Sequence, residues 1–171
     1  TVTISYRLSS QAAITVTIGE HLALANQVQD PGLHSVTWNG HDAEGKPVAP
    51  SFLMACMFWH EVSARWKAVR EHGETAVPAL QQAIDATFEA RIGDISGRGK
   101  LAADMREVWL MQPRFEKRTG NAPMAMLKQP RFRAAFDFLR LRADAGEGDR
   151  ELVEWWQDFS NGDEEQQTAL V

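Results

Sequence analysis

The hydrophobic period of the chain changes between residues 40 and 50, and this change constrains the fold more than any other feature. Before it, apolar and polar residues alternate with a period of two, over residues 2–8, 14–18 and 33–38. After it, apolar residues recur about every three to four positions, as on one face of an amphipathic helix. The sequence therefore predicts a mainly α fold, with about five or six helices in an irregular bundle and an N-terminal antiparallel β unit of three or four strands.

Capping and turn residues predict where the helices begin and end. Ser51 is a candidate N-cap for the first helix, and Gly73 and Gly93 are candidate stops for the first and second. Asp149 is a candidate N-cap for the last helix. The expected helices cover residues 51–72, 79–91, 100–112, 113–120, 130–143 and 149–159. The predicted domains are a β unit over 1–46, a helical body over 47–160, and a frayed acidic tail over 161–171.

The net charge of −5 conceals an uneven distribution of charged residues. Residues 98–142 contain eleven lysines and arginines against four acids, whereas residues 143–171 contain one against nine. A basic segment between acidic ones is typical of a nucleic-acid-binding surface, because clustered cations neutralise phosphates. The sequence therefore favours nucleic acid as a partner, although the mean charge does not.

The candidate RNA-binding residues are the lysines and arginines that lie in or beside the helices of this basic segment. They are Arg106, Arg114, Lys117, Arg118, Lys128, Arg131, Arg133, Arg140 and Arg142. Arginine binds phosphate through two donors and stacks on bases, which suits single-stranded RNA. The alternative is a stripe of salt bridges, since Arg133 and Asp137 stand four positions apart and Arg140 follows three positions later. The interleaved tryptophans and phenylalanines fall mainly on the buried helical face, where they are expected to support the fold.

No catalytic or metal-binding pattern stands out in the sequence. His60-Glu61 begins a zinc-protease motif, but position 64 is alanine and the second histidine ligand is missing. The single cysteine, Cys56, excludes an internal disulfide and favours a reducing, cytoplasmic location. No apolar run approaches the roughly 18 residues of a membrane span, so no membrane partner is expected.

Two runs of the basic segment resemble a known enzyme family. Residues 105–118, MREVWLMQPRFEKR, and residues 129–139, QPRFRAAFDFL, are similar to signatures of bacterial poly(A) polymerases, and the match extends over about residues 45–159. These enzymes are template-independent nucleotidyltransferases related to the CCA-adding enzymes.

The resemblance implies a role and also a limit to that role. The corresponding region of the family is a helical body that holds the RNA 3′ end, which implies RNA positioning by Arg106, Arg114, Arg118, Arg131 and Arg133. The family's catalytic head, with paired aspartates for magnesium and ATP, has no counterpart in these residues. The resemblance therefore implies no catalytic residue and no cofactor in this chain, which is predicted to be inactive alone.

The N-terminal residues resemble a different family. Residues 4–8, 14–18 and 32–40 are similar to the immunoglobulin-like module of flagellar hook-capping proteins, and the two resemblances meet at residues 44–50, as in a fusion or chimera. An incomplete β module leaves unpaired strand edges, which predicts a homo-oligomer formed through the N-terminal strands. The alternative function is thus a self-assembling structural protein, without an RNA role, whose arginines pair with its own acidic tail.

Overall fold

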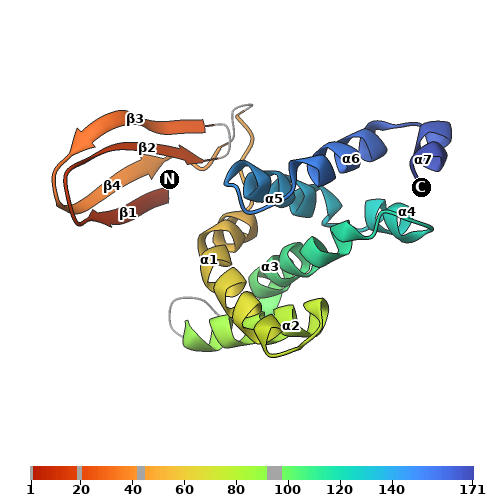
Figure 1. The fold of residues 1–171 in the computed structure, drawn as a ribbon. Coiled ribbons are helices and arrows are strands. Elements are labelled where there is room, and N and C mark those ends of the chain that lie inside the picture. Colours follow the sequence, from red (N-terminus) through yellow and green to blue (C-terminus); the bar gives the residue numbers. More distant parts are fainter. Residues whose placement is uncertain (1, 19–20, 42–44, 92–97) are drawn as a thin grey trace. The chain divides into compact units, whose positions relative to one another are not determined.

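The computed structural model describes residues 2–18, 21–41, 45–91 and 98–171, and the chain divides into two compact units, Thr1–Ala49 and Pro50–Val171. The first unit is built from strands and the second from helices (Figure 1). The predicted fold class, mainly α with a small antiparallel β unit at the N-terminus, is confirmed.

The first unit consists of two antiparallel pairs of strands. Strand β1 (Val2–Leu8) pairs with β4 (Gly32–Trp38), and β2 (Ala12–Ile18) pairs with β3 (His21–Gln29). The hydroxyl of Tyr6 on β1 donates a hydrogen bond of 2.7 Å to the side-chain oxygen of Gln29 on β3. The alternation predicted for β4 is confirmed, because Val36 and Trp38 are buried whereas Leu33 is 70% exposed.

The pairing of β2 with β3 is irregular in the middle. Its register shifts on both sides of Val16, and Asn26 opposite has a φ of 42°. Asparagine tolerates this left-handed conformation better than most residues, and the Asn26 amide donates to the Thr15 hydroxyl oxygen at 3.1 Å. The sequence alternation did not reveal β3 as a separate strand, because a bulge interrupts its period.

The second unit contains seven α-helices and one 3₁₀ helix among the described residues. Their bounds are α1 Pro50–Glu71, α2 Ala76–Ala90, α3 Gly99–Met111, η1 Gln112–Glu116, α4 Ala122–Leu127, α5 Phe132–Asp144, α6 Arg150–Asn161 and α7 Glu164–Leu170. None of these helices is long and apolar enough to cross a membrane.

Several helix ends follow the sequence signals. Gly73 has a φ of 94°, which suits a residue just beyond a helix end, and the Asp149 side chain accepts the Glu151 amide at 2.9 Å as the N-cap of α6. By contrast, Ser51 does not cap α1, because the helix already begins at Pro50 and Ser51 is buried inside it. The predicted stop at Gly93 lies outside the described residues.

Two short helices were not expected. The segment after Pro113 forms a 3₁₀ helix and then a separate helix, α4, rather than one helix up to Gly120. The acidic tail, expected to be frayed, forms α7, whose capping box joins Asp163 and Gln166. A helix of one or two turns is too short to show a clear hydrophobic period, so its capping residues are the main sequence signal that predicts it.

Helix α5 joins two hydrophobic clusters. Its Phe138 packs with α1, α2 and α3, whereas Phe136 and Leu139 pack with η1, α4 and α6. The first cluster centres on Trp59, Leu80, Ile84, Phe88, Met105 and Trp109. The second centres on Phe115, Met126, Phe136, Leu152, Trp156 and Phe159. Because successive side chains on a helix point about 100° apart, one helix can serve both clusters and hold the basic segment on a shared support.

Candidate nucleic-acid interface

The nine predicted RNA-binding residues lie on consecutive elements of the second unit. Arg106 is on α3, Arg114 is on η1, and Lys117 and Arg118 are in the turn that follows η1. Lys128 directly follows α4 and Arg131 directly precedes α5. The remaining three, Arg133, Arg140 and Arg142, are on α5. The contacts of these side chains divide them into three groups.

The first group forms ion pairs within the protein. Arg106 lies 2.5 Å from the Asp85 carboxylate of α2 and also covers the Phe88 ring at 5.0 Å. Arg131, just before α5, lies 2.5 Å from the Asp104 carboxylate of α3 and 3.8 Å from that of Glu107. These two arginines therefore tie α3 to its neighbours.

Arg133 and Arg140 share one acid on α5. The guanidinium of Arg133 lies 3.1 Å and that of Arg140 lies 3.8 Å from the Asp137 carboxylate. These are the i,i+4 and i,i+3 spacings at which helical side chains meet. The salt-bridge alternative raised by the sequence therefore describes Arg133 and Arg140 correctly.

The pKa of the Asp104 carboxyl reflects its ion pairs with Arg131 and Lys100. Desolvation acts to raise its pKa, but the hydrogen bond from Lys100 and the charges of Arg131 and Lys100 outweigh it and lower the pKa below the usual value. Asp104 therefore stays ionised at neutral pH and neutralises part of the charge of its two basic neighbours.

Arg142 forms a second group by itself. Its guanidinium donates to the Gln112 side-chain oxygen at 3.1 Å and to the Glu147 carbonyl at 3.4 Å, and it covers the Trp59 ring at 4.7 Å. Burial lowers its pKa, although the carboxylates of Glu147 and Glu116 act in the opposite direction. These contacts join α1, α5 and the start of η1, so Arg142 supports the fold.

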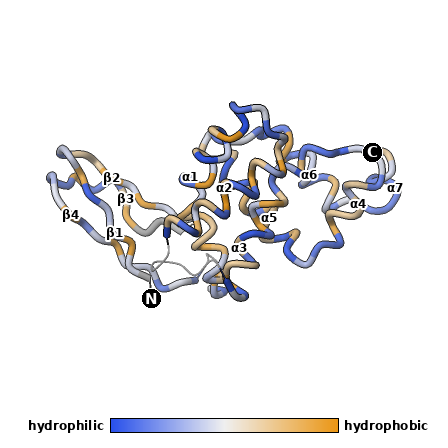
Figure 2. Tube along the Cα trace, turned by 90° about the horizontal axis from the view of Figure 1, so that it is seen from below, coloured by the Kyte–Doolittle hydropathy of each residue, from blue (hydrophilic) through white to orange (hydrophobic). Residues whose placement is uncertain are grey.

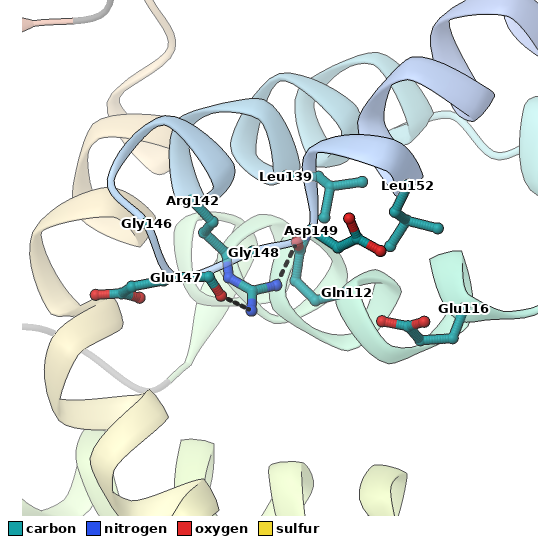
Figure 3. Close-up of a pocket in the computed structure, with 9 residues that line it drawn as sticks. All are labelled: Gln112, Glu116, Leu139, Arg142, Gly146, Glu147, Gly148, Asp149 and Leu152. Carbon is teal, nitrogen blue, oxygen red and sulfur yellow. Dashed lines mark hydrogen bonds between the residues drawn. The ribbon is translucent and has the colours of Figure 1, made fainter.

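Arg142 also lines an open pocket of about 430 Å³ (Figure 3). Figure 3 shows its guanidinium between Gln112 and the Gly146–Gly148 turn, with Glu116 and Asp149 at the rim. The lining contains three acidic residues, Glu116, Glu147 and Asp149, and one arginine, and the Glu147 carboxylate accepts the Trp59 indole N–H at 2.9 Å. Because this balance repels phosphate, the pocket is not part of a phosphate-binding surface.

The third group forms no side-chain ion pair or hydrogen bond with any residue that the structure describes. Arg114, Lys117, Arg118 and Lys128 are all exposed, and all lie between the end of α3 and the start of α5. Glu116 is the single acid among residues 112–128. Figure 2 shows the connection between α3 and α4 as a hydrophilic stretch. This segment, residues 114–128, is called the open basic segment below.

Buried aromatic side chains hold the open basic segment in place. Phe115 is fully buried, and its carbonyl accepts the Trp156 indole N–H at 2.8 Å. The two rings meet edge to face, with centroids 5.1 Å apart. Because Phe115 lies inward, its neighbours Arg114 and Glu116 lie outward. The expectation that most aromatic side chains support the fold is confirmed for Trp109, Phe115 and Phe136.

Sequence reasoning missed the polar residues that support this site. Gln112 is buried and donates to the carbonyls of Val108 and Ala135, at 2.9 and 3.1 Å, while it accepts from Arg142. The signal that could have found it is its helical spacing, because Gln112 stands seven positions after Met105 and four after Val108, on the buried face of α3. The part of the chain that the structure describes contains no group of three histidine, cysteine or acidic side chains that could hold a metal ion.

Comparison with known proteins identifies the family. The family model described as "Polymerase A arginine-rich C-terminus" matches residues 72–171, more than half of the chain. The chain belongs to this family. The match covers the whole of the open basic segment and both flanking helices, so the predicted resemblance to the C-terminal region of bacterial poly(A) polymerases is confirmed.

Individual poly(A) polymerases are also similar in sequence to this chain. Poly(A) polymerase I of Haemophilus influenzae is 31% identical over 128 residues, which cover 70% of this chain and 27% of that protein. The same enzyme of Escherichia coli O6:H1 is 32% identical over 115 residues (66% and 25%), and that of Salmonella typhi is 28% identical over 127 (72% and 27%). The chain thus spans about a quarter of the length of these curated relatives.

Proposed function

We propose that the helical unit binds RNA through the open basic segment, as the non-catalytic body of a polynucleotide adenylyltransferase-related protein. The observation that carries this proposal is the absence of acidic partners for Arg114, Lys117, Arg118 and Lys128 among the described residues. An exposed cation without an internal partner can bind a phosphate without first breaking an ion pair. The family of the chain supports the same function.

The proposed binding is electrostatic and independent of base sequence. Each exposed lysine or arginine that contacts a phosphate releases a condensed counterion, which favours binding at low salt. Arg106, Arg131, Arg133 and Arg140 contribute less in this proposal, because each already faces a carboxylate. Arg142 contributes to stability and not to phosphate contact.

The relatives are named poly(A) polymerases, and this name suggests the wider setting. We infer that the helical unit holds single-stranded RNA near its 3′ end while a catalytic head, which supplies the ATP and magnesium site, adds adenylates. In this proposal the chain by itself binds no cofactor, has no activity and works in the cytoplasm.

The experiment that tests the proposal is a titration of labelled oligo(A) with this chain, followed by fluorescence anisotropy at several salt concentrations. We expect binding that weakens with salt, with a slope of log K against log[salt] of about −3, since each phosphate contact to a single strand contributes about −0.7. Arg114→Ala should weaken binding and reduce the slope by about 0.7. The matched control is Arg133→Ala, since Arg133 is exposed but paired with Asp137.

Two results would contradict the proposal. Binding that does not depend on salt would exclude a phosphate-contacting surface, and equal losses in the two variants would show that pairing does not decide which arginines bind RNA.

A second candidate function rests on the strands of the first unit. Both of its sheets have two strands, and Val28 and Leu33 on β3 and β4 are 68% and 70% exposed. A two-stranded sheet offers its outer edges to strands of another chain. Light scattering tests this function: a concentration-dependent dimer or larger species supports self-assembly through the strands, and a monomer at all concentrations excludes it.

A further inference from the structure

One tryptophan differs from the other five in how its polar atom is used. The indole N–H groups of the other five donate to protein acceptors at 2.8–3.1 Å. These residues are Trp38, Trp59, Trp66, Trp109 and Trp156. The Trp155 indole N–H has no acceptor among the residues that the structure describes. A buried tryptophan normally finds a partner for this donor, whereas the half-buried Trp155 leaves it open to solvent or to a ligand.

The Trp155 ring is held in place although it is only partly buried. It stacks nearly parallel on Phe159, with centroids 4.9 Å apart and an interplanar angle of 9°, and it meets Trp156 edge to face at 5.1 Å. One face of the indole is thus covered by protein while the residue keeps exposed surface. A ring fixed in this way loses little conformational entropy when a ligand stacks on it.

A chain of ring contacts connects Trp155 to the open basic segment. Trp156 contacts both Trp155 and Phe115, and the ring centroids lie 5.1 Å apart in each pair. Phe115 follows Arg114 directly, and Leu127, which precedes Lys128, packs on the same hydrophobic cluster as Trp155. The partly exposed ring of Trp155 and the exposed cations are therefore held by the same hydrophobic cluster.

We propose that Trp155 is a stacking platform for an unpaired base of the RNA strand whose phosphates contact the open basic segment. The inference rests on the proposed RNA binding and adds a residue that contacts the bases of the strand. Cations that follow the backbone, with aromatic rings on which bases stack, are the general means of binding single strands without sequence preference. The free indole N–H can in addition donate to a base or ribose oxygen. Duplex RNA, with its bases stacked on each other, cannot use this ring.

The decisive experiment compares two probes of equal length: oligo(A) with a central 2-aminopurine, and an abasic ribose-phosphate oligomer. Trp155→Leu should weaken binding of oligo(A) on the order of tenfold, because it removes the stacked ring, and should leave binding of the abasic oligomer and the salt slope unchanged. Trp155→Phe should restore most of the affinity. Quenching of 2-aminopurine fluorescence should be strong with the unmodified chain and weak with Trp155→Leu.

The matched control is Trp66→Leu. Trp66 is also partly buried, but it packs against the first hydrophobic cluster and donates its N–H to the Ala76 carbonyl. Circular dichroism and thermal unfolding show whether each variant keeps its fold, and the quenching measurement on the unmodified chain does not depend on any variant.

The possible results separate this inference from the proposed function. Equal losses for both probes in Trp155→Leu, or unchanged quenching, would overturn the stacking role and leave phosphate binding intact. Failure of the unmodified chain to bind either probe would overturn the proposed function and the stacking role together. Loss confined to the probe with bases supports both.

Discussion

The cations on and beside α3 and α5 and those of the open basic segment carry the same kind of charge but have different surroundings. On α3 and α5, helical spacing and helix packing bring acids such as Asp104 and Asp137 next to the arginines. Between the two helices the chain runs through η1, a turn and α4, and Glu116 is the single acid there. A count of positive charges in the sequence adds the two groups together, although only the first faces carboxylates among the described residues. The comparison can be tested by changing each group separately.

The largest effect is expected when all four open cations are neutralised. The variant Arg114→Ala, Lys117→Ala, Arg118→Ala and Lys128→Ala should weaken binding of oligo(A) at least about 100-fold at low salt, and should reduce the magnitude of the salt slope by about 3. Anisotropy titration at several salt concentrations measures both quantities.

The control for this variant neutralises four arginines of the paired group. Replacement of Arg106, Arg131, Arg133 and Arg140 by glutamine removes the same charge, so a general electrostatic effect would weaken binding equally. A clearly smaller loss is expected, and an equal or larger loss would show that the two groups do not differ in function.

The next effect concerns stability and not binding. Arg142→Met removes the donors to Gln112 and to the Glu147 carbonyl and the contact with Trp59, so we expect a loss of about 2 kcal/mol in the free energy of unfolding. Urea unfolding followed by tryptophan fluorescence measures this loss. Arg133→Ala, at an exposed ion pair, should change stability by less than about 1 kcal/mol. An Arg142 variant that is fully stable but binds oligo(A) poorly would return Arg142 to the RNA-binding residues.

A smaller effect in the opposite direction is expected for Asp104→Asn. Removal of this carboxylate frees Arg131 and Lys100 from their common partner, so oligo(A) should bind about two- to fivefold more tightly, with a salt slope steeper by about 0.7. Asp144→Asn makes the same change in net charge at an exposed residue of α5. If both variants bind equally, net charge and not pairing limits the contribution of Arg131.

The smallest effect concerns an ion pair outside the basic segment. The hydrogen bond from Arg91 lowers the pKa of Glu61 below its usual 4.5, against desolvation. Because the pKa is lower in the folded state, the pair stabilises the protein above pH 4.5, and this contribution is lost as the pH falls through the folded-state value. Glu61→Gln should cost less than about 1 kcal/mol at pH 7 and flatten the decline of stability below pH 4.5, with no change in oligo(A) binding. Unfolding by urea at several pH values checks this, and an unchanged decline would contradict it.

Much of the fold could be predicted from the sequence because local signals agreed with the final packing. The change of period near residue 45 separated strands from helices, and Gly73 and Asp149 marked true helix ends. The short helices α4 and α7 were missed because one or two turns show no clear period. The resemblance of the N-terminal residues to hook-capping modules, the chimeric origin and the homo-oligomer stay predictions.

The sequence by itself determined which residues carry positive charge and that they gather between residues 106 and 142. It also determined the family to which the chain belongs. Only the tertiary structure decided which of these residues contact a partner on another element. Arg131 meets Asp104 across 27 positions of sequence, and Arg142 reaches Trp59 across 83, whereas Arg114 meets no acid within the part of the chain that the structure describes. A residue's charge is fixed by its side chain. Local spacing indicates a partner on the same helix, such as Asp137 for Arg133, but a partner on another element is set by packing between distant parts of the chain.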